Sequence, residues 1–315
     1  MGRGSLPETD PLWAGVLPDG TVTVPILASA DVVLAVGCRF AHRSTRGLLL
    51  HLDFRPDQAL LHLDIDPGVI GTLHRPEIAL VGDAREGLEQ LALALGPGAP
   101  RPGWDPAWLA ARRAARSPRC TPIIRRALHV LREALPPETI VAADQTALNY
   151  WMEWHFPVYQ RRTFLYPVGS ATLGYGVPAA IGAQVAHPGR PVVAVVGDGG
   201  FLFAVNELAT AVKYRLPVVL LVVNDGQYGA IRYLQEGLFG RSGETDLTNP
   251  DFPALARAFG AEGVRVDLDG LAGALRAGLA RTGPTVVELP LAVEPPWELA
   301  RPDAAPAPAP APLPA

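Results

Sequence analysis

Short apolar runs alternate with longer segments of helical periodicity along most of this chain. The apolar runs hold about four to eight residues between turn-forming residues, which is typical of buried strands. The strands expected from this pattern are residues 30–37, 60–66, 78–82, 139–143, 191–197, 216–223, 263–266 and 284–290. The helices expected between them include residues 86–95, 177–186, 206–214 and 254–260. Because apolar strands alternate with amphipathic helices, we predict an α/β fold in which helices flank parallel sheets on both faces.

This alternation falls into two zones separated by a stretch rich in Gly and Pro. Residues 1–95 are expected to form one domain and residues 107–293 a second, longer one. Residues 96–106, with the sequence GPGAPRPGWDP, have the composition of a linker. Residues 294–315 end in alternating Ala and Pro, which cannot bury enough apolar surface to fold, so a disordered tail is expected there.

Composition and charge narrow the class of function. The 315 residues carry a formal net charge of −4 and no block of Lys or Arg, so no nucleic-acid partner is expected. The longest apolar run, residues 216–223, is too short to cross a bilayer, and the N-terminus has no apolar signal core. The two cysteines, Cys38 and Cys120, have no metal-binding spacing and suit a reducing compartment. We therefore expect a cytoplasmic enzyme with no membrane partner.

Two glycine-containing turns follow consecutive buried strands and carry the chemistry of the chain. The first is GDGG at residues 197–200, and the second is NDGQYG at residues 224–229. One helix and one return strand separate them, and these lengths close a right-handed βαβ unit. Both strand ends then lie at the same edge of the sheet, where ligands bind in open α/β folds. We expect Asp198 and Asp225 to face each other across a small gap.

The residue types at this edge suit a diphosphate bound through a metal ion. Gly197, Gly199 and Gly200 permit close backbone approach, and N–H groups at such a turn attract phosphate. Two carboxylates alone would repel phosphate, so a bridging cation is needed. Mg²⁺ takes oxygen ligands from one or two carboxylates, phosphate and water. The alternative is that both aspartates only cap helices.

GDG followed by Asn-Asp and the trailing GQYGAIR resembles the cofactor motif of thiamin-diphosphate-dependent enzymes of the acetolactate synthase and benzoylformate decarboxylase type. The resemblance implies thiamin diphosphate and Mg²⁺ as cofactors. It implies metal ligation by the side chains of Asp198 and Asp225 and by the carbonyl oxygen of Gln227. Asn is more common than Asp at position 225 in the family, but both supply oxygen. The cofactor-binding residues implied around them are Gly197, Gly199, Gly200, Asn224, Tyr228 and Gly229.

Two upstream segments extend the resemblance. Residues 168–200 are similar to the family segment in which a bulky apolar residue wedges between the two cofactor rings. That residue is Leu173 here, and the carbonyl of Ala171 would accept a hydrogen bond from the aminopyrimidine; the alternative is that Leu173 is a core residue. Residues 143–151, ADQTALNYW, resemble a stretch that contacts the diphosphate through Gln145 and Thr146. A strand-to-helix capping turn is an equal alternative for this stretch.

The first zone resembles the central domain of the same family, on residues 30–40, 61–71 and 79–91. The resemblance therefore implies two Rossmann-like domains, a shortened central one and a C-terminal one of the thiamin-diphosphate-binding fold. Relatives sometimes carry FAD or ADP in the central domain, and whether this chain does stays open.

Full-length relatives begin with a pyrimidine-binding domain that supplies a catalytic glutamate, and residues before 20 are not expected to form it. We therefore expect an inactive isolated chain, a possible partner subunit that bears this domain, and a homo-oligomer, since family sites form between subunits. The expected reaction is decarboxylation of a small 2-oxo acid such as pyruvate, with or without carboligation. A non-catalytic cofactor-binding module or truncated remnant is the alternative, and the identity of the 2-oxo acid stays open.

Overall fold

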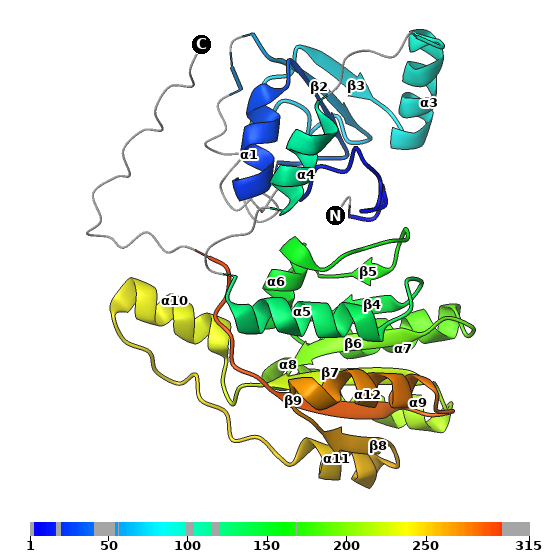
Figure 1. The fold of residues 1–315 in the computed structure, drawn as a ribbon, viewed down its shortest axis with the longest axis vertical. Coiled ribbons are helices and arrows are strands. Elements are labelled where there is room, and N and C mark those ends of the chain that lie inside the picture. Colours follow the sequence, from blue (N-terminus) through cyan, green and yellow to red (C-terminus); the bar gives the residue numbers. More distant parts are fainter. Residues whose placement is uncertain are drawn as a thin grey trace. The chain divides into compact units, whose positions relative to one another are not determined.

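The computed structural model describes residues 3–16, 20–40, 54–55, 57–98, 104–114, 120–167 and 169–297. The chain divides into two compact units, unit 1 (Met1–Pro118) and unit 2 (Arg119–Ala315), and each is described by itself. Both units have the α/β architecture predicted from the sequence, with parallel strands and flanking helices (Figure 1). Within the described ranges, each helix lacks either the length or the apolar character needed to cross a membrane.

Unit 1 is built on a three-stranded parallel sheet in the order β1-β2-β3. Its strands are β1 (Val32–Val36), β2 (Ala59–Asp64) and β3 (Ile78–Val81), and its helices are α1 (Gly20–Ser29), α3 (Ala84–Leu95) and α4 (Pro106–Ala114). Asp83 caps α3 by accepting hydrogen bonds from the backbone of Arg85 and Glu86, and Gly96 ends the helix. Among the described residues, the buried apolar core around β1 and β2 centres on Ala35, Phe40 and Leu60.

Helix α4 belongs to unit 1, because Leu109 of α4 and Ile26 of α1 bury each other's apolar surface. The division of the chain therefore falls after Pro118. The sequence placed the linker at residues 96–106 and began the second domain at residue 107. Composition marks the Gly- and Pro-rich stretch, but the packing partner of α4 decides its unit.

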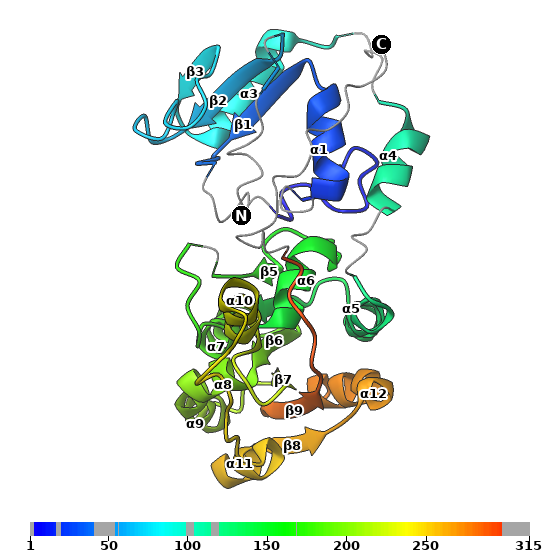
Figure 2. The same ribbon diagram turned by 90° about the vertical axis from the view of Figure 1, so that its left-hand side faces the viewer.

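Unit 2 is built on a six-stranded sheet in the order β5-β4-β6-β7-β9-β8, in which every pair of neighbours is parallel (Figure 2). Its strands are β4 (Ile140–Ala143), β5 (Phe164–Leu165), β6 (Val192–Gly197), β7 (Val218–Asn224), β8 (Glu262–Arg265) and β9 (Thr285–Pro290). Its helices are α5 (Pro122–Ala134), α6 (Ala147–His155), α7 (Gly176–Ala186), α8 (Asp198–Ala204), η2 (Val205–Glu207), α9 (Leu208–Lys213), α10 (Gly229–Phe239), α11 (Phe252–Phe259) and α12 (Leu268–Leu279).

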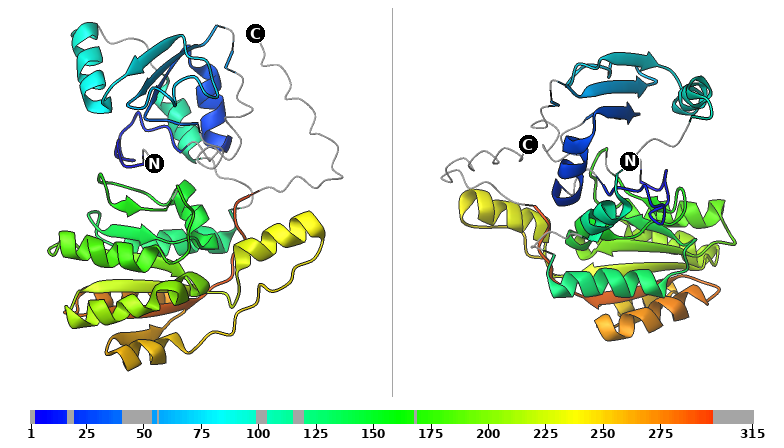
Figure 3. Two further views of the ribbon diagram at one scale, coloured as in Figure 1. Left: turned by 180° about the vertical axis from the view of Figure 1, so that it is seen from behind. Right: turned by 45° about the horizontal axis from the view of Figure 1, so that its top comes forward.

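Helices cover both faces of the six-stranded sheet. Apolar side chains of α5, α6 and α12 pack on one face with Val193, Val195, Leu221 and their neighbours. Apolar side chains of α7, α8, α9 and α11 pack on the other face with the alternate residues of the same strands. The central strands are therefore buried on both sides, which explains why they are apolar without interruption. Helix α10 has no buried residue and projects away from the sheet (Figure 3).

Two expectations need correction. The helix after β6 begins at Asp198 and continues through η2 and α9, whereas the sequence predicted only residues 206–214. Glycines at its start weaken the helical pattern, and packing against the sheet compensates. Residues 294–297 are also ordered, although they were assigned to the tail: Trp151 Nε1 donates to the carbonyl of Glu294 at 2.7 Å and Tyr233 Oη to that of Trp297 at 2.6 Å. Residues 298–315 lie outside the described residues.

Candidate functional site

The two glycine-containing turns meet at the edge of the sheet formed by the carboxyl ends of β6 and β7. Gly197 of β6 is in register with Val223 of β7, so Asp198 and Asn224 follow at neighbouring positions. The turn that carries Asp225 is bound to Asp198, whose Oδ2 accepts a hydrogen bond from the N–H of Gly226 at 2.9 Å. The proximity expected for Asp198 and Asp225 is therefore present.

Burial and like charge shape the electrostatics of this pair. Desolvation raises the pKa of Asp225 to about 6, and the negative charge of Asp198 adds to the rise. Hydrogen bonds from Gln227 act in the opposite direction. Asp198 is buried, and its Oδ1 accepts from the N–H of Gly199 at 2.9 Å. A cation between the carboxylates would relieve their repulsion.

The glycines of the site allow protein atoms to pack closely. A Cβ on Gly199 would lie 2.6 Å from Cε1 of Tyr228, and one on Gly229 would overlap Oδ2 of Asp225. Gly226 adopts a φ of 71°, in the left-handed region that glycine favours. The N–H of Gly199 is engaged by Asp198, so this group serves the carboxylate; the sequence had suggested that it attracts phosphate.

A short segment, residues 245–247, pairs in antiparallel fashion with the second turn. Tyr228 N–H donates to the carbonyl of Thr245 at 2.8 Å, and Leu247 N–H donates to that of Gly226 at 2.8 Å. Gln227 pairs with Asp246 between these two bonds, and its side-chain Oε1 accepts from Arg232 Nη1 at 2.8 Å. These contacts fix the backbone at Gln227, whose carbonyl is a predicted metal ligand.

Asp144, which the sequence prediction missed, connects three segments beside the first turn. Its fully buried carboxylate accepts hydrogen bonds from Gln145 N–H at 2.7 Å and Gly176 N–H at 2.8 Å. Burial raises the pKa of Asp144, and the backbone donors partly offset this. A Cβ on Gly200 would lie 3.3 Å from the Asp144 carboxyl carbon. An acidic residue directly after a buried strand was the available signal.

The predicted diphosphate contacts follow Asp144. Thr146 occupies the N-cap position of α6, but its side chain makes no capping hydrogen bond. Its side chain borders the first turn, because a Cβ on Gly197 would lie 3.3 Å from the Thr146 Cβ. Gln145 is buried, and its side chain hydrogen-bonds to Tyr166. Burial is the main cause that raises the pKa of Tyr166. Thr146 therefore lies beside the GDGG turn, as a phosphate contact requires, and the roles of both residues stay predictions.

The predicted cofactor wedge lies on the loop before α7. Leu173 is half-buried, and among the described residues it joins neither hydrophobic cluster of unit 2. Ala171 has a φ of 51°, in the left-handed region that favours glycine over residues with a side chain. The wedge role of Leu173 and the carbonyl role of Ala171 stay predictions.

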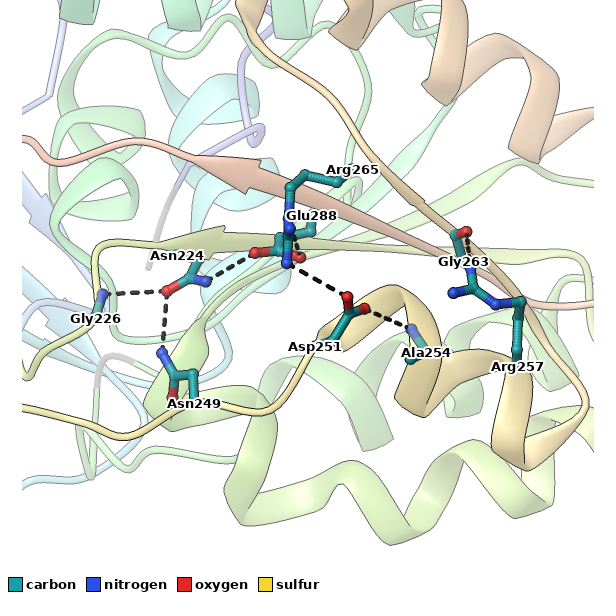
Figure 4. Close-up of polar contacts among 9 residues, drawn as sticks. All are labelled: Asn224, Gly226, Asn249, Asp251, Ala254, Arg257, Gly263, Arg265 and Glu288. Atoms are coloured by element: carbon teal, nitrogen blue, oxygen red, sulfur yellow. Dashed lines mark hydrogen bonds and ion pairs between the residues drawn. The ribbon is translucent and has the colours of Figure 1, made fainter.

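A network of amides and carboxylates, also missed by the sequence prediction, lies behind the two turns (Figure 4). Asn224 Nδ2 donates to Glu288 Oε1 at 2.8 Å, and its Oδ1 accepts from Gly226 N–H at 3.1 Å. Asn249 Nδ2 donates to Asp198 Oδ2 at 2.7 Å and to Asn224 Oδ1 at 3.0 Å. Both ends of the Asn224 side chain are thus engaged by protein groups. A glutamate inside the apolar strand PTVVELP was the signal for Glu288.

The side chains at this site are too few to bind Mg²⁺ alone, so a backbone carbonyl, phosphate oxygens and water would have to complete its coordination. Among the residues that the structure describes, no three His, Cys, Asp or Glu side chains gather in a way that could hold a metal ion. The predicted ligands are two carboxylates and one backbone carbonyl, which leaves coordination positions for phosphate oxygens and water. That is the usual arrangement of Mg²⁺ bound with a phosphorylated ligand.

Comparison with family models gives two matches on this chain. Residues 144–289 match the C-terminal TPP-binding domain of thiamine pyrophosphate enzymes. Residues 1–91 match the central domain of thiamine pyrophosphate enzymes. The first match spans the turns, the Asp144 segment and the network behind them.

Individual relatives point the same way. The chain is 38% identical over 299 residues to a probable 2-ketoarginine decarboxylase of Pseudomonas aeruginosa, covering 91% of this chain and 52% of that protein. It is 32% identical over 314 residues to the acetolactate synthase isozyme 2 large subunit of Escherichia coli, covering 96% and 56%. The structure resembles a thiamine diphosphate-dependent 4-hydroxybenzoylformate decarboxylase of Rhodococcus jostii, with a TM-score of 0.69, 25% identity and 93% and 54% coverage. The chain spans about half the length of the curated relatives it matches.

Proposed function

The chain belongs to the thiamine pyrophosphate enzymes, and from that premise we propose that unit 2 binds the cofactor diphosphate through Mg²⁺. The proposed metal ligands are the side chains of Asp198 and Asp225 and the carbonyl oxygen of Gln227. The observation that carries this proposal is the bond from Gly226 N–H to Asp198, which holds the turn bearing Asp225 against the start of α8. A cation at this edge of the sheet would relieve the repulsion between the two carboxylates.

The remaining predicted site residues surround this centre. Gly197, Gly199 and Gly200 bring the backbone of the first turn close, and Thr146 lies beside Gly197. In the proposed complex Gln145 and Thr146 contact the diphosphate. Leu173 would support the rings of the cofactor, and the Ala171 carbonyl would accept a hydrogen bond from its aminopyrimidine ring.

For the complete enzyme we propose decarboxylation of a 2-oxo acid, with or without addition to a second carbonyl compound. Bound thiamin diphosphate supplies the carbanion chemistry, and this chain's residues hold and orient it. The relatives support this reaction class, since they include a probable 2-ketoarginine decarboxylase and an acetolactate synthase large subunit. We also propose that a glutamate-bearing pyrimidine-binding domain completes the site in the assembled enzyme.

A non-catalytic cofactor-binding module is the second candidate, because the family model that spans the site describes a TPP-binding domain. Activity assays separate the two. The first proposal predicts carbon dioxide release from pyruvate, benzoylformate or 2-ketoarginine when the chain is combined with a pyrimidine-binding domain. Asp198→Ala should abolish this release, while Asp246→Ala, on a side chain that is 88% exposed, should not. Cofactor binding without release from any of the three acids would favour the binding module.

A further inference from the structure

A continuous polar chain crosses three neighbouring strands of unit 2 and ends at Asp198, the first residue of α8. It starts at Arg265, the last residue of β8, passes to Glu288 of β9 and then to Asn224 at the end of β7. Arg265 Nε donates to Glu288 Oε2 at 2.9 Å, and Asn224 Nδ2 donates to Glu288 Oε1 at 2.8 Å. From Asn224 the chain continues to Asn249 (Figure 4). Asn249 in turn donates to Asp198, which follows β6.

Strand register explains how these side chains meet. Glu288 is in register with Arg265 on one side and with Val222 on the other. Asn224 lies two residues after Val222 and so projects from the same face of the sheet as Glu288. The carboxylate therefore receives one donor from each neighbouring strand.

Glu288 is an unusual residue for its position. It is 1% exposed and lies between the apolar residues Val287 and Leu289 of β9. Burying a carboxylate is costly even when it is paired, and an apolar residue of similar volume is often as stable or more stable. Stability of the fold alone therefore does not explain a buried glutamate at this position. Its hydrogen bond with Asn224 does.

A second route from Arg265 reaches the same segment. Arg265 Nη2 lies 3.9 Å from Oδ2 of Asp251, and Oδ1 of Asp251 caps α11 by accepting from Ala254 N–H at 2.7 Å. Asn249 lies two residues before Asp251. Arg265 thus contacts Glu288, which binds Asn224, and also Asp251, which lies in the same segment as Asn249.

We propose that Glu288, Arg265 and Asn249 are positioning residues of the metal site, acting through Asn224. Glu288 orients the Asn224 amide so that its Oδ1 accepts from Gly226 and Asn249. Those two donors also bind Oδ2 of Asp198, at 2.9 and 2.7 Å, and so fix the carboxylate and the turn that bears Asp225. These residues would not bind the metal themselves. Their hydrogen bonds orient the side chains and backbone that would bind it, and such hydrogen bonds tune the affinity of a metal site.

This inference rests on the proposed metal role of Asp198 and Asp225. Its test compares Glu288→Leu, Glu288→Gln, Asn249→Ala and Arg265→Ala in the full chain. Leu keeps much of the volume and removes both acceptors, whereas Gln retains an Oε1 that can accept from Asn224. The matched control is Glu262→Leu on β8, which loses an ion pair to Arg281 (3.1 Å) that has no link to Asn224.

The first measurement is the Kd for Mg²⁺ in the presence of thiamin diphosphate, with thermal melting as a check on folding. Glu288→Leu should raise this Kd about 10- to 100-fold, as loss of an outer partner of a metal site does. Asn249→Ala should act similarly, Arg265→Ala less, and Glu288→Gln should recover part of the loss. Glu262→Leu should leave the Kd unchanged. A folded Glu288→Leu chain with the wild-type Kd would overturn the proposal and leave the metal site standing.

The second measurement is amide hydrogen exchange over residues 224–229 in the metal-free chain, which does not need binding. Exchange should be faster in Glu288→Leu and Asn249→Ala than in Glu262→Leu, because Gly226 N–H loses an oriented acceptor. If the wild-type chain binds no Mg²⁺, the proposed metal site fails, and exchange alone decides the positioning role. Equal exchange in Glu288→Leu and Glu262→Leu would then overturn it.

Discussion

The two sheets contain similar apolar strands but place them in different surroundings. In unit 2 every residue of β4 and β6 is buried, and helices pack on both faces. In unit 1 the edge strand β3 exposes Ile78 and Val81, and α3 has no buried residue. The difference teaches that an apolar run predicts a strand, while the helices packed on the sheet decide how deeply that strand is buried.

This difference also explains where the candidate site can form. Unit 2 holds three buried carboxylates, and each accepts a hydrogen bond from another segment of the unit. They belong to Asp198, Asp144 and Glu288. Unit 1 has aspartates at its strand ends too, but Asp66 and Asp83 mainly receive local backbone bonds at exposed turns. Hydrogen bonds from several elements therefore place the carboxylates of Asp198, Asp144 and Glu288 in unit 2.

The sharpest way to break this comparison is to truncate one strand residue in each sheet. Leu221→Ala in β7, at a side chain with 0% exposure, should lower the free energy of unfolding by about 2–5 kcal/mol through lost burial and a cavity. Val81→Ala in β3, at a side chain with 63% exposure, should change it by less than about 0.5 kcal/mol. Urea unfolding followed by circular dichroism measures both. Equal losses would show that the two sheets are buried alike.

Glycine substitutions in one helix sharpen the picture of dense packing in unit 2. Gly176→Ala at the start of α7 would place a Cβ 2.6 Å from Val196 Cγ1 of β6, so we expect a cost of about 1–3 kcal/mol. Gly182→Ala in the same helix meets no atom within 4 Å and should stabilise by about 0.5–1 kcal/mol. Thermal melting of both variants is the measurement. A stabilising Gly176→Ala would contradict close contact between α7 and β6.

A pH titration tests the electrostatics of the unit 2 site in the absence of metal. Burial and Asp198 raise the folded-state pKa of Asp225 from 3.8 to about 6, so the folded chain binds this proton more tightly than the unfolded chain. The contribution of Asp225 to stability should therefore fall as pH rises from about 4 to about 6 and stay level above that. Melting temperatures in EDTA across this range should show the fall in wild type and less of it in Asp225→Asn. The same slope in both proteins would rule out the shift.

The smallest effect is expected on the helix of unit 1. Leu93→Lys on α3 changes a side chain that is 80% exposed, and it should alter the free energy of unfolding by less than about 0.5 kcal/mol. Chemical denaturation measures it, with Leu208→Lys on α9, a fully buried position, as the opposite extreme. A large loss from Leu93→Lys would show that α3 is covered in solution.

Local pattern predicted most of the strands because each is a short apolar run, and it brought Asp198 and Asp225 together because consecutive parallel strands end at one edge. It missed the helical start at Asp198, since glycines weaken the periodic signal. It could not predict that β4 is more deeply buried than β3. Both are short apolar runs, and their burial depends on which helices pack on each sheet. The links from Glu288 to Asn224 and from Asn249 to Asp198 depend on register and loop path, which no local pattern contains.

The central claim is that Asp198 and Asp225 hold thiamin diphosphate through Mg²⁺, and calorimetric titration tests it most directly. The purified chain would be titrated with thiamin diphosphate in Mg²⁺ and again in EDTA, beside Asp198→Ala. The account predicts binding in Mg²⁺ that disappears in EDTA and in the variant. Binding that survives EDTA or Asp198→Ala, or no binding in Mg²⁺, would contradict it.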